Sequence, residues 1–418
     1  MYIYMQFKAQ SGELIKAFLP KIDECHRKQS KTRLNKLLLN IYNDLYESDR
    51  YVSERINSNC LKAQIRRLND DSSKPKIYFS RFFPKHVREY IKTTEKHQLV
   101  YNCDIDGRKI SIYFTIFSED ELANLDEYDK HARFMYMWLY VCSLYSRKKC
   151  AKTLDIYIYL TPFTKSLPDT NTSTLGPDNV NTAFTLACSP NSEMVIFRRE
   201  EWMKVFIHET FHTYGLDFSS HDSNIIKKSV SGIFPIDSEY NIEEAYAETW
   251  GRIINSAFCS YNSLIDKKDT KTFFLYMDFS LRMERLFSLY QCEKVLRFMG
   301  LTYEDLHSSD EKSAYLRKNF YREKTNVFSY YVLTAVFMDN YLGFLQWCSD
   351  NNTAFMKFNG THKNMEKFSK FIEDNYDSET FKSGLECVGK IGRRKRGKKS
   401  DKLSTLLQTT RMSIIDIV

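Results

Sequence analysis

The segment EEWMKVFIHETFHTYGLDF occupies residues 200–218, and its most informative part is the pentapeptide HETFH, an HExxH motif. Its two histidines, His208 and His212, are four residues apart, so on a helix they project from one face about 5–6 Å apart. Two imidazoles at that spacing can bind one zinc ion. Glu209 then lies beside the ion, where its carboxylate can act as general base on a metal-bound water. Apolar residues on the other faces predict a buried helix.

The alternative interpretation of this motif is structural. An HExxH sequence arises by chance in roughly 1% of chains of this length and composition, because the motif specifies only three positions. Two hydrogen-bonded histidines beside an ion-paired glutamate would then account for it. A third ligand is needed to separate the two interpretations, since catalytic zinc commonly has three protein ligands and one open position.

The best candidates for that ligand lie in the segment NIEEAYAETWGRIINSAF, residues 241–258. Glu244 and Glu248 are one helical turn apart and face the same side. One can bind zinc while the other accepts a hydrogen bond from the far nitrogen of a ligand histidine. Small neighbouring residues favour helix packing over an exposed acidic face. Asp217 and His221 are the alternative third ligands, and Asp217 is also expected to support a ligand histidine.

An HExxH motif followed after 31 residues by a helical ExxAE resembles the gluzincin zinc metallopeptidases, the thermolysin- and neprilysin-like group. The helix EEAYAETW is also similar to the ligand helix of lethal-factor-like toxin proteases. VNTAF at 180–184, followed by NSEMVIF, resembles the VNAF-type segment and edge strand that hold peptide substrate in neprilysin-like enzymes. The similarity covers residues 153–252. More loosely, the whole chain resembles uncharacterised metallopeptidases of large DNA viruses.

The resemblance implies a zincin-like fold, one zinc ion per chain and a peptide or protein substrate. It implies that Glu244 is the third ligand, that Glu248 supports a ligand histidine and that Glu209 is the catalytic base. It also implies substrate contacts by residues of the VNTAF segment, namely Asn181, Ala183 and Phe184. The oxyanion that develops during hydrolysis needs a donor, and the candidates near the site are Tyr240, Tyr330 and Tyr331.

Period-two patterns around Asp106-Gly107 predict a hairpin over about 98–117, and strands are also expected at 154–160, 183–188 and 194–197. Most of the rest has helical periodicity. The sequence therefore predicts an α+β protein, mostly helical, with a small mixed sheet whose edge strand precedes the HExxH helix. We expect an N-terminal helical region (1–95), the metallopeptidase core (96–265), a C-terminal helical region (266–385) and a basic, flexible tail (386–418).

The net charge of +8 is concentrated in that tail. Residues 390–402 carry +7, which leaves +1 for the rest of the chain. The stretch Arg393–Lys399 is therefore a candidate contact for nucleic acid or an import receptor. A solvated terminus without a partner is the alternative.

The ten cysteines include no CxxC pair, and the N-terminus has no signal-peptide pattern. We therefore expect reduced thiols and an intracellular reducing location, such as host cytoplasm, nucleus or virion. No apolar stretch approaches 18 residues, so no membrane contact is expected.

Together these features predict a zinc-dependent metalloendopeptidase with Glu209 as general base. Two alternatives remain at this point. One is a catalytically inactive zinc-binding scaffold, and the other is a virion structural or nucleic-acid-associated protein.

Overall fold

The computed structural model describes residues 5, 7–68, 74–391 and 402–416. The chain forms two compact units: residues 1–39, 165–180 and 221–418 make a helical unit, and residues 40–164 and 181–220 make a sheet unit. This division differs from the four successive regions expected from the sequence. Each unit groups segments that are far apart along the chain, and local composition does not reveal such grouping.

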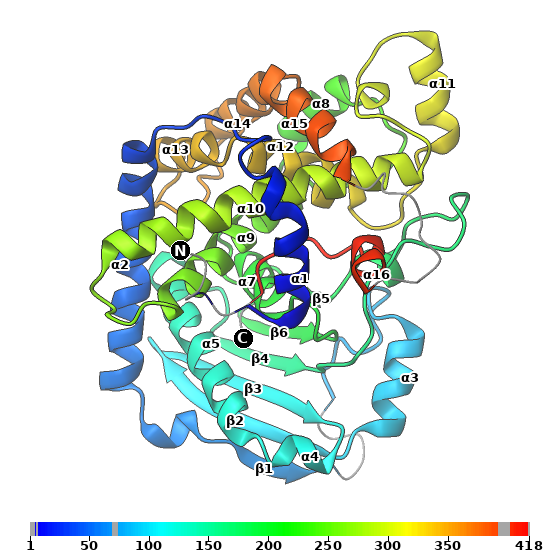
Figure 1. Cartoon of the computed structure of the whole chain (residues 1–418). Coiled ribbons are helices and arrows are strands. Elements are labelled where there is room, and N and C mark those ends of the chain that lie inside the picture. The colour runs from blue at the N-terminus through cyan, green and yellow to red at the C-terminus, as the bar shows by residue number, and fades with distance from the viewer. Residues whose placement is uncertain (1–4, 6, 69–73, 392–401, 417–418) are drawn as a thin grey trace. The chain divides into compact units, whose positions relative to one another are not determined.

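The sheet unit contains one mixed six-stranded sheet, so the α+β class is confirmed. Its strands are β1 (Gln64–Arg67), β2 (His97–Ile105), β3 (Arg108–Ile116), β4 (Thr153–Ile158), β5 (Ala183–Thr185) and β6 (Asn191–Ile196). The order is β1-β2-β3-β4-β6-β5, with β3, β4 and β6 parallel and the other neighbouring pairs antiparallel (Figure 1). The edge strand that precedes the HExxH helix is β5, whereas β6, expected at the edge, lies between β4 and β5.

The predicted hairpin is confirmed in β2 and β3. Its turn residues Asp106 and Gly107 have φ angles of 52° and 76°. Positive φ at both central positions is the requirement of a type I′ turn, and Asp-Gly meets it at low cost. The Gly107 N–H also donates to Asp104 Oδ1 at 2.9 Å, which closes the turn.

The HExxH helix is α7 (Trp202–Thr213), and every residue in it is buried. It packs on β5 and β6 and against α5 (Leu125–Tyr145). Trp138 Nε1 donates to Thr210 Oγ1 at 2.6 Å across the contact between the two helices. The other helical elements of this unit are α3 (Lys85–Thr94), α4 (Glu119–Leu122), η3 (Ser58–Leu61) and most of α2 (Lys31–Arg55).

The helical unit is arranged around α10 (Thr270–Phe298), which contacts α1, α9, α12 and α15. Its long elements are α1 (Ala9–Phe18), α8 (Asn224–Ile233), α9 (Glu243–Asn262), α11 (Glu311–Phe320), α13 (Tyr341–Asn351), α14 (His362–Asn375) and α15 (Glu379–Gly389). Shorter elements are η2 (Leu19–Lys21), α6 (Pro177–Val180), η5 (Glu304–Leu306), the π-helix η6 (Phe328–Leu333), α12 (Thr334–Asp339) and α16 (Lys402–Gln408). Within the described residues, no helix combines the length and hydropathy needed to cross a membrane.

The C-terminal segment is part of the core of the helical unit. Residues 409–416 are buried, and Glu284 of α10 accepts hydrogen bonds from Ser413 Oγ (2.5 Å) and from the N–H groups of Ile414 (3.0 Å) and Ile415 (2.8 Å). From α9, Asn255 Nδ2 donates to the Ile415 carbonyl at 2.8 Å. The expectation of a flexible tail is therefore wrong for these residues, while residues 392–401, with most of the basic cluster, lie outside the described residues.

Four of the ten cysteines form disulfides, Cys25–Cys387 and Cys150–Cys188. The expectation of reduced thiols is wrong for these four, because pairing depends on spatial proximity and their separations of 362 and 38 residues form no recognisable motif. The intracellular location that rested on that expectation stays a prediction.

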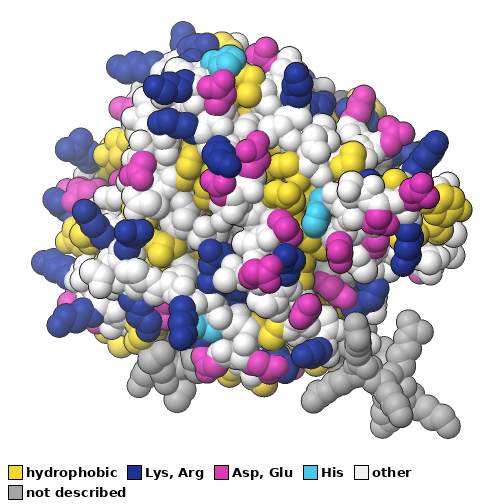
Figure 2. Space-filling model, turned by 90° about the horizontal axis from the view of Figure 1, so that it is seen from above, with side chains coloured by type: hydrophobic (Ala, Val, Ile, Leu, Met, Phe, Trp, Pro, Cys, Tyr) yellow, Lys and Arg dark blue, Asp and Glu magenta, His cyan; other side chains and the backbone are white. Residues whose placement is uncertain are grey.

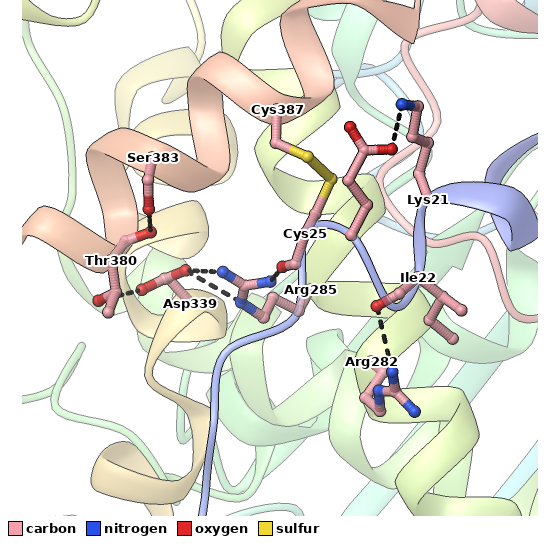
Figure 3. The surroundings of a disulfide bond; sticks show 10 residues. Lys21, Ile22, Cys25, Arg282, Arg285, Asp339, Thr380, Ser383 and Cys387 are labelled. Atoms are coloured by element: carbon pink, nitrogen blue, oxygen red, sulfur yellow. Dashed lines mark hydrogen bonds and ion pairs between the residues drawn. A yellow bond between two sulfur atoms is a disulfide. The ribbon is translucent and has the colours of Figure 1, made fainter.

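Figure 3 shows that the Cys25–Cys387 bridge lies beside a buried ion pair. Arg285 of α10 donates to Asp339 Oδ1 through Nε (3.0 Å) and Nη2 (2.7 Å), and through Nη1 to the Cys25 carbonyl. Arg27 Nη1 donates to Asp339 Oδ2 at 2.5 Å. The segment around Cys25 is thus tied to α15 covalently and to α10 and α12 by hydrogen bonds.

We expect the Cys25→Ser/Cys387→Ser variant to lose about 2–5 kcal/mol of unfolding free energy, because the bridge restricts a long loop in the unfolded chain. Chain entropy predicts that the Cys150–Cys188 bridge contributes about 2 kcal/mol less, from 1.5RT ln(362/38). Urea unfolding of both double variants measures the difference. A dithiol reductant that left the wild-type midpoint unchanged would contradict the expectation.

We expect Glu284→Gln to lower the unfolding free energy by about 2–4 kcal/mol, since a buried carboxylate with three donors becomes an amide. Glu293→Gln on the same helix is the matched control. Its carboxylate pairs with Arg297 at 2.7 Å on a partly exposed face, where pairs contribute about 0–1 kcal/mol. Equal losses in the two variants would show that the C-terminal segment does not depend on Glu284.

Candidate metal centre

Helix α7 brings the two histidines of the motif into direct contact. His208 and His212 are buried, and their Nε2 atoms lie 3.2 Å apart. Two imidazole nitrogens at that distance repel if both present lone pairs, so a proton or a cation between them is favourable. The i, i+4 spacing predicted a shared face, and the structure places the two ring nitrogens toward the same point.

Asp217 supports one of these histidines. Its Oδ2 contacts His212 Nδ1, and its Oδ1 accepts hydrogen bonds from Ser219 N (3.1 Å) and Ser219 Oγ (2.7 Å). A carboxylate at Nδ1 keeps the ring proton there and leaves the Nε2 lone pair for a metal ion. Asp217 thus lies on the side of the ring away from His208, where a supporting residue belongs and a third ligand does not.

A tight turn after α7 brings Asp217 back to His212. Gly215 has a φ of 60°, its N–H donates to the His212 carbonyl at 3.1 Å, and Leu216 N donates to the Phe211 carbonyl at 2.8 Å. This is the usual helix ending that requires glycine in the left-handed region. A Cβ at position 215 would also approach the sulfur atoms of the Cys150–Cys188 disulfide to 3.3 Å.

Glu244 lies in the first turn of α9 and is half-buried. Tyr330 Oη donates to its Oε2 at 2.8 Å, and Asn326 Nδ2 donates to its Oε1 at 3.4 Å. Glu244 belongs to the helical unit, whereas His208 and His212 belong to the sheet unit, so their joint ligation of one ion stays a prediction. Two imidazoles and one glutamate are a donor set of catalytic zinc sites, so these residues fit zinc.

Glu248, expected behind a ligand histidine, has a different partner in the helical unit. Its Oε1 accepts a hydrogen bond from Arg252 Nε at 2.9 Å, and both side chains are 1% exposed. Arg252 Nη1 in turn donates to Ser288 Oγ on α10. Such complete burial is tolerated only because the charges are paired and hydrogen-bonded. The histidine contact of Glu248 stays a prediction.

The three tyrosines considered as oxyanion donors have separate surroundings. Tyr240 Oη shares a hydrogen bond of 3.1 Å with Ser231 Oγ, and burial raises the pKa of the Tyr240 hydroxyl, which keeps it protonated at neutral pH. Tyr331 Oη donates to the Thr410 carbonyl at 2.6 Å, in the C-terminal segment. Tyr330 Oη donates to Oε2 of Glu244, the proposed third ligand.

The expected substrate residues surround the edge strand β5. Ala183 and Phe184 belong to it, and the Phe184 ring is buried in an aromatic cluster with Phe83 and Phe197. The Asn181 carbonyl accepts a hydrogen bond from Arg198 Nε at 3.0 Å. The Phe184 side chain thus supports the strand from the core side, and substrate contact by these residues stays a prediction.

His221, the other alternative ligand, lies against the backbone of Gly360 so closely that a Cβ there would come within 2.1 Å of its ring.

Two residues near the glutamates of α9, Asn326 and Arg252, were not predicted from the sequence. Arg252 could have been predicted as a partner of Glu248 from its i, i+4 spacing. Asn326 had no local signal, because its contact with Glu244 spans 82 residues.

Comparisons with protein-family models, curated proteins and solved structures gave no match for this chain. The assignment of the site therefore depends on its own residues and their geometry.

We expect Asp217→Asn to weaken zinc binding about 10–100-fold, the usual effect of losing a carboxylate behind a ligand histidine. Asp222→Asn, an exposed change five residues away, is the control and should leave zinc affinity unchanged. Competition with a chromophoric chelator measures both. Equal zinc affinity in the two variants would show that Asp217 does not support His212 as a metal ligand.

Proposed function

We propose that this protein is a zinc-dependent hydrolase, specifically a metalloendopeptidase of the gluzincin type. The observation that carries the proposal is the buried pair of His208 and His212, whose Nε2 atoms lie 3.2 Å apart while Asp217 contacts Nδ1 of His212. The HExxH motif supplies these histidines, and the ExxAE helix supplies Glu244 as the proposed third ligand.

In this proposal His208, His212 and Glu244 hold the ion. When bound, zinc would lower the pKa of a coordinated water toward neutrality and polarise a scissile carbonyl. Asp217 keeps the proton of His212 on Nδ1, so that Nε2 stays a ligand. Glu209 is buried and adjacent to His208 along the helix. Its carboxylate accepts the proton of the attacking water and passes it to the departing amine.

A peptide is the favoured substrate because the sheet unit ends in β5. Within the described residues β5 pairs with β6 on one side, so its other side can accept an extended chain through backbone hydrogen bonds. This edge is followed, after β6, by the helix that carries the proposed base.

The alternative is a catalytically inactive scaffold in which zinc has only a structural role. Glu209 argues against it, because a structural zinc site is closed by four ligands and has no use for a neighbouring carboxylate. A nucleic-acid role would depend on the basic stretch Arg393–Lys399, which lies outside the described residues. On the face drawn in Figure 2, Lys and Arg side chains lie among Asp and Glu side chains, a mixed surface that does not itself favour phosphate binding.

We expect the purified wild type to contain one zinc ion per chain by elemental analysis. Glu209→Gln should retain that zinc but lose peptide hydrolysis by at least about 100-fold, because the base is removed and the ligands remain. Glu244→Ala should lose most of the zinc.

A fluorogenic peptide library measures hydrolysis in these variants. A wild type that folds, contains no zinc and cleaves no peptide would overturn the proposed function. A Glu209→Gln variant as active as the wild type would instead support zinc binding without the proposed role of Glu209.

A further inference from the structure

The segment that contacts Glu244 has an uncommon backbone. Residues Phe328–Leu333 form a π-helix, η6, which continues directly into α12. Thr334 Oγ1 donates to the Ser329 carbonyl at 2.8 Å, which satisfies a polar group within the widened turn. Such turns are rare, cost stability and occur frequently at functional sites. We therefore examined which contacts depend on the π-helix.

That reason is found at the Glu244 carboxylate. Tyr330, in the π-helix, donates to Oε2 at 2.8 Å, and Asn326, four residues earlier, donates to Oε1 at 3.4 Å. Each carboxylate oxygen thus has one donor from the same short segment. With both oxygens engaged, rotation of the carboxylate about its last torsion breaks two hydrogen bonds at once.

The orientation of the Asn326 amide follows from a second contact. The backbone N–H of Asn241, just before α9, donates to Asn326 Oδ1 at 2.9 Å. Since a backbone N–H requires an acceptor, the oxygen of the amide must face Asn241, and the NH₂ group must face Glu244. Asn326 is also held at a positive φ of 37°, an uncommon conformation that asparagine tolerates better than most residues.

The same segment is fastened to the start of α9 independently of Glu244. Ser329 Oγ donates to the Asn241 carbonyl at 2.7 Å, and the rings of Tyr240 and Phe328 lie 4.7 Å apart. Tyr330 therefore approaches Glu244 from a segment whose position relative to α9 is already set.

Glu323 anchors the beginning of the π-helix. Its Oε2 accepts the N–H of Phe328 at 3.1 Å, and its Oε1 accepts Ser238 Oγ at 2.8 Å and Tyr321 Oη at 3.0 Å. Burial raises the pKa of the Glu323 carboxyl, and these hydrogen bonds oppose that shift. One carboxylate thus joins the loop before α9 to the first turn of η6.

We propose that Tyr330, presented by the π-helix and assisted by Asn326, is a positioning residue that holds the Glu244 carboxylate in a single orientation for metal binding. The inference rests on the proposed function, in which Glu244 is the third ligand. It assigns the Tyr330 hydroxyl proton to Glu244 and so replaces the oxyanion-donor role expected from the sequence. A ligand held in place beforehand binds more tightly, because less conformational freedom is lost on binding.

The test compares Tyr330→Phe with Tyr331→Phe in the full chain. Both variants remove one hydroxyl and keep the ring, but the Tyr331 hydroxyl donates to Thr410 and not to Glu244. We expect Tyr330→Phe to weaken zinc binding about 10–100-fold in chelator competition and to alter the visible absorption of the Co²⁺-substituted protein. Tyr331→Phe should change neither the affinity nor the spectrum.

A Tyr330→Phe variant with wild-type zinc affinity and Co²⁺ spectrum but a lower kcat would overturn the inference in favour of an oxyanion donor. A wild type that binds no zinc would contradict the proposed function instead. In that event the metal-free protein still tests the contact by a double-mutant cycle of Tyr330→Phe and Glu244→Gln. We expect the unfolding equilibrium constant of the double variant to differ about 5–10-fold from the value that the two single variants predict together. If the two single effects combined independently, the inference would be overturned.

Discussion

Two imidazoles held within a hydrogen-bond distance of each other, inside a fully buried helix, are the constraint from which the candidate site follows. The His208 and His212 Nε2 atoms lie 3.2 Å apart, and burial removes the water that would otherwise hydrate them. Such a pair is stable when a proton or a cation lies between the two nitrogens. The turn at Gly215 brings the Asp217 carboxylate to His212 Nδ1, which favours the tautomer whose Nε2 lone pair faces His208.

In the helical unit, buried polar side chains of α9 and α10 are likewise paired by hydrogen bonds. Glu244 at the start of α9 is held by Tyr330 and Asn326, Glu248 by Arg252, and Arg252 by Ser288 of α10. Further along, Asn255 and Glu284 hold the C-terminal segment. Buried polar groups of this kind are costly unless satisfied, so their pairing makes the relative position of the two helices specific.

Proximity in space also explains the disulfides. Cys25 and Cys387 are far apart in sequence, yet the loop after η2 and helix α15 both pack against α10, which brings the two Cα atoms to a separation of 5.8 Å. Arg285 and Asp339 beside them are buried and mutually satisfied, so the covalent bridge and the ion pair stabilise the same junction. The cost of desolvating that pair is offset by its three hydrogen bonds to Asp339 and to the Cys25 carbonyl.

The sequence by itself determined the features that depend on local periodicity. The Asp106-Gly107 hairpin, the helix with His208 and His212 on one face, and the helix with Glu244 follow from residue spacing and turn chemistry. The tertiary structure alone decided the strand order, which makes β5 the edge, and the burial of residues 409–416. It also decided the partners of Glu244, because Asn326 and Tyr330 reach it across 82 and 86 residues. Contacts of that range depend on how whole elements pack, and no local pattern encodes them.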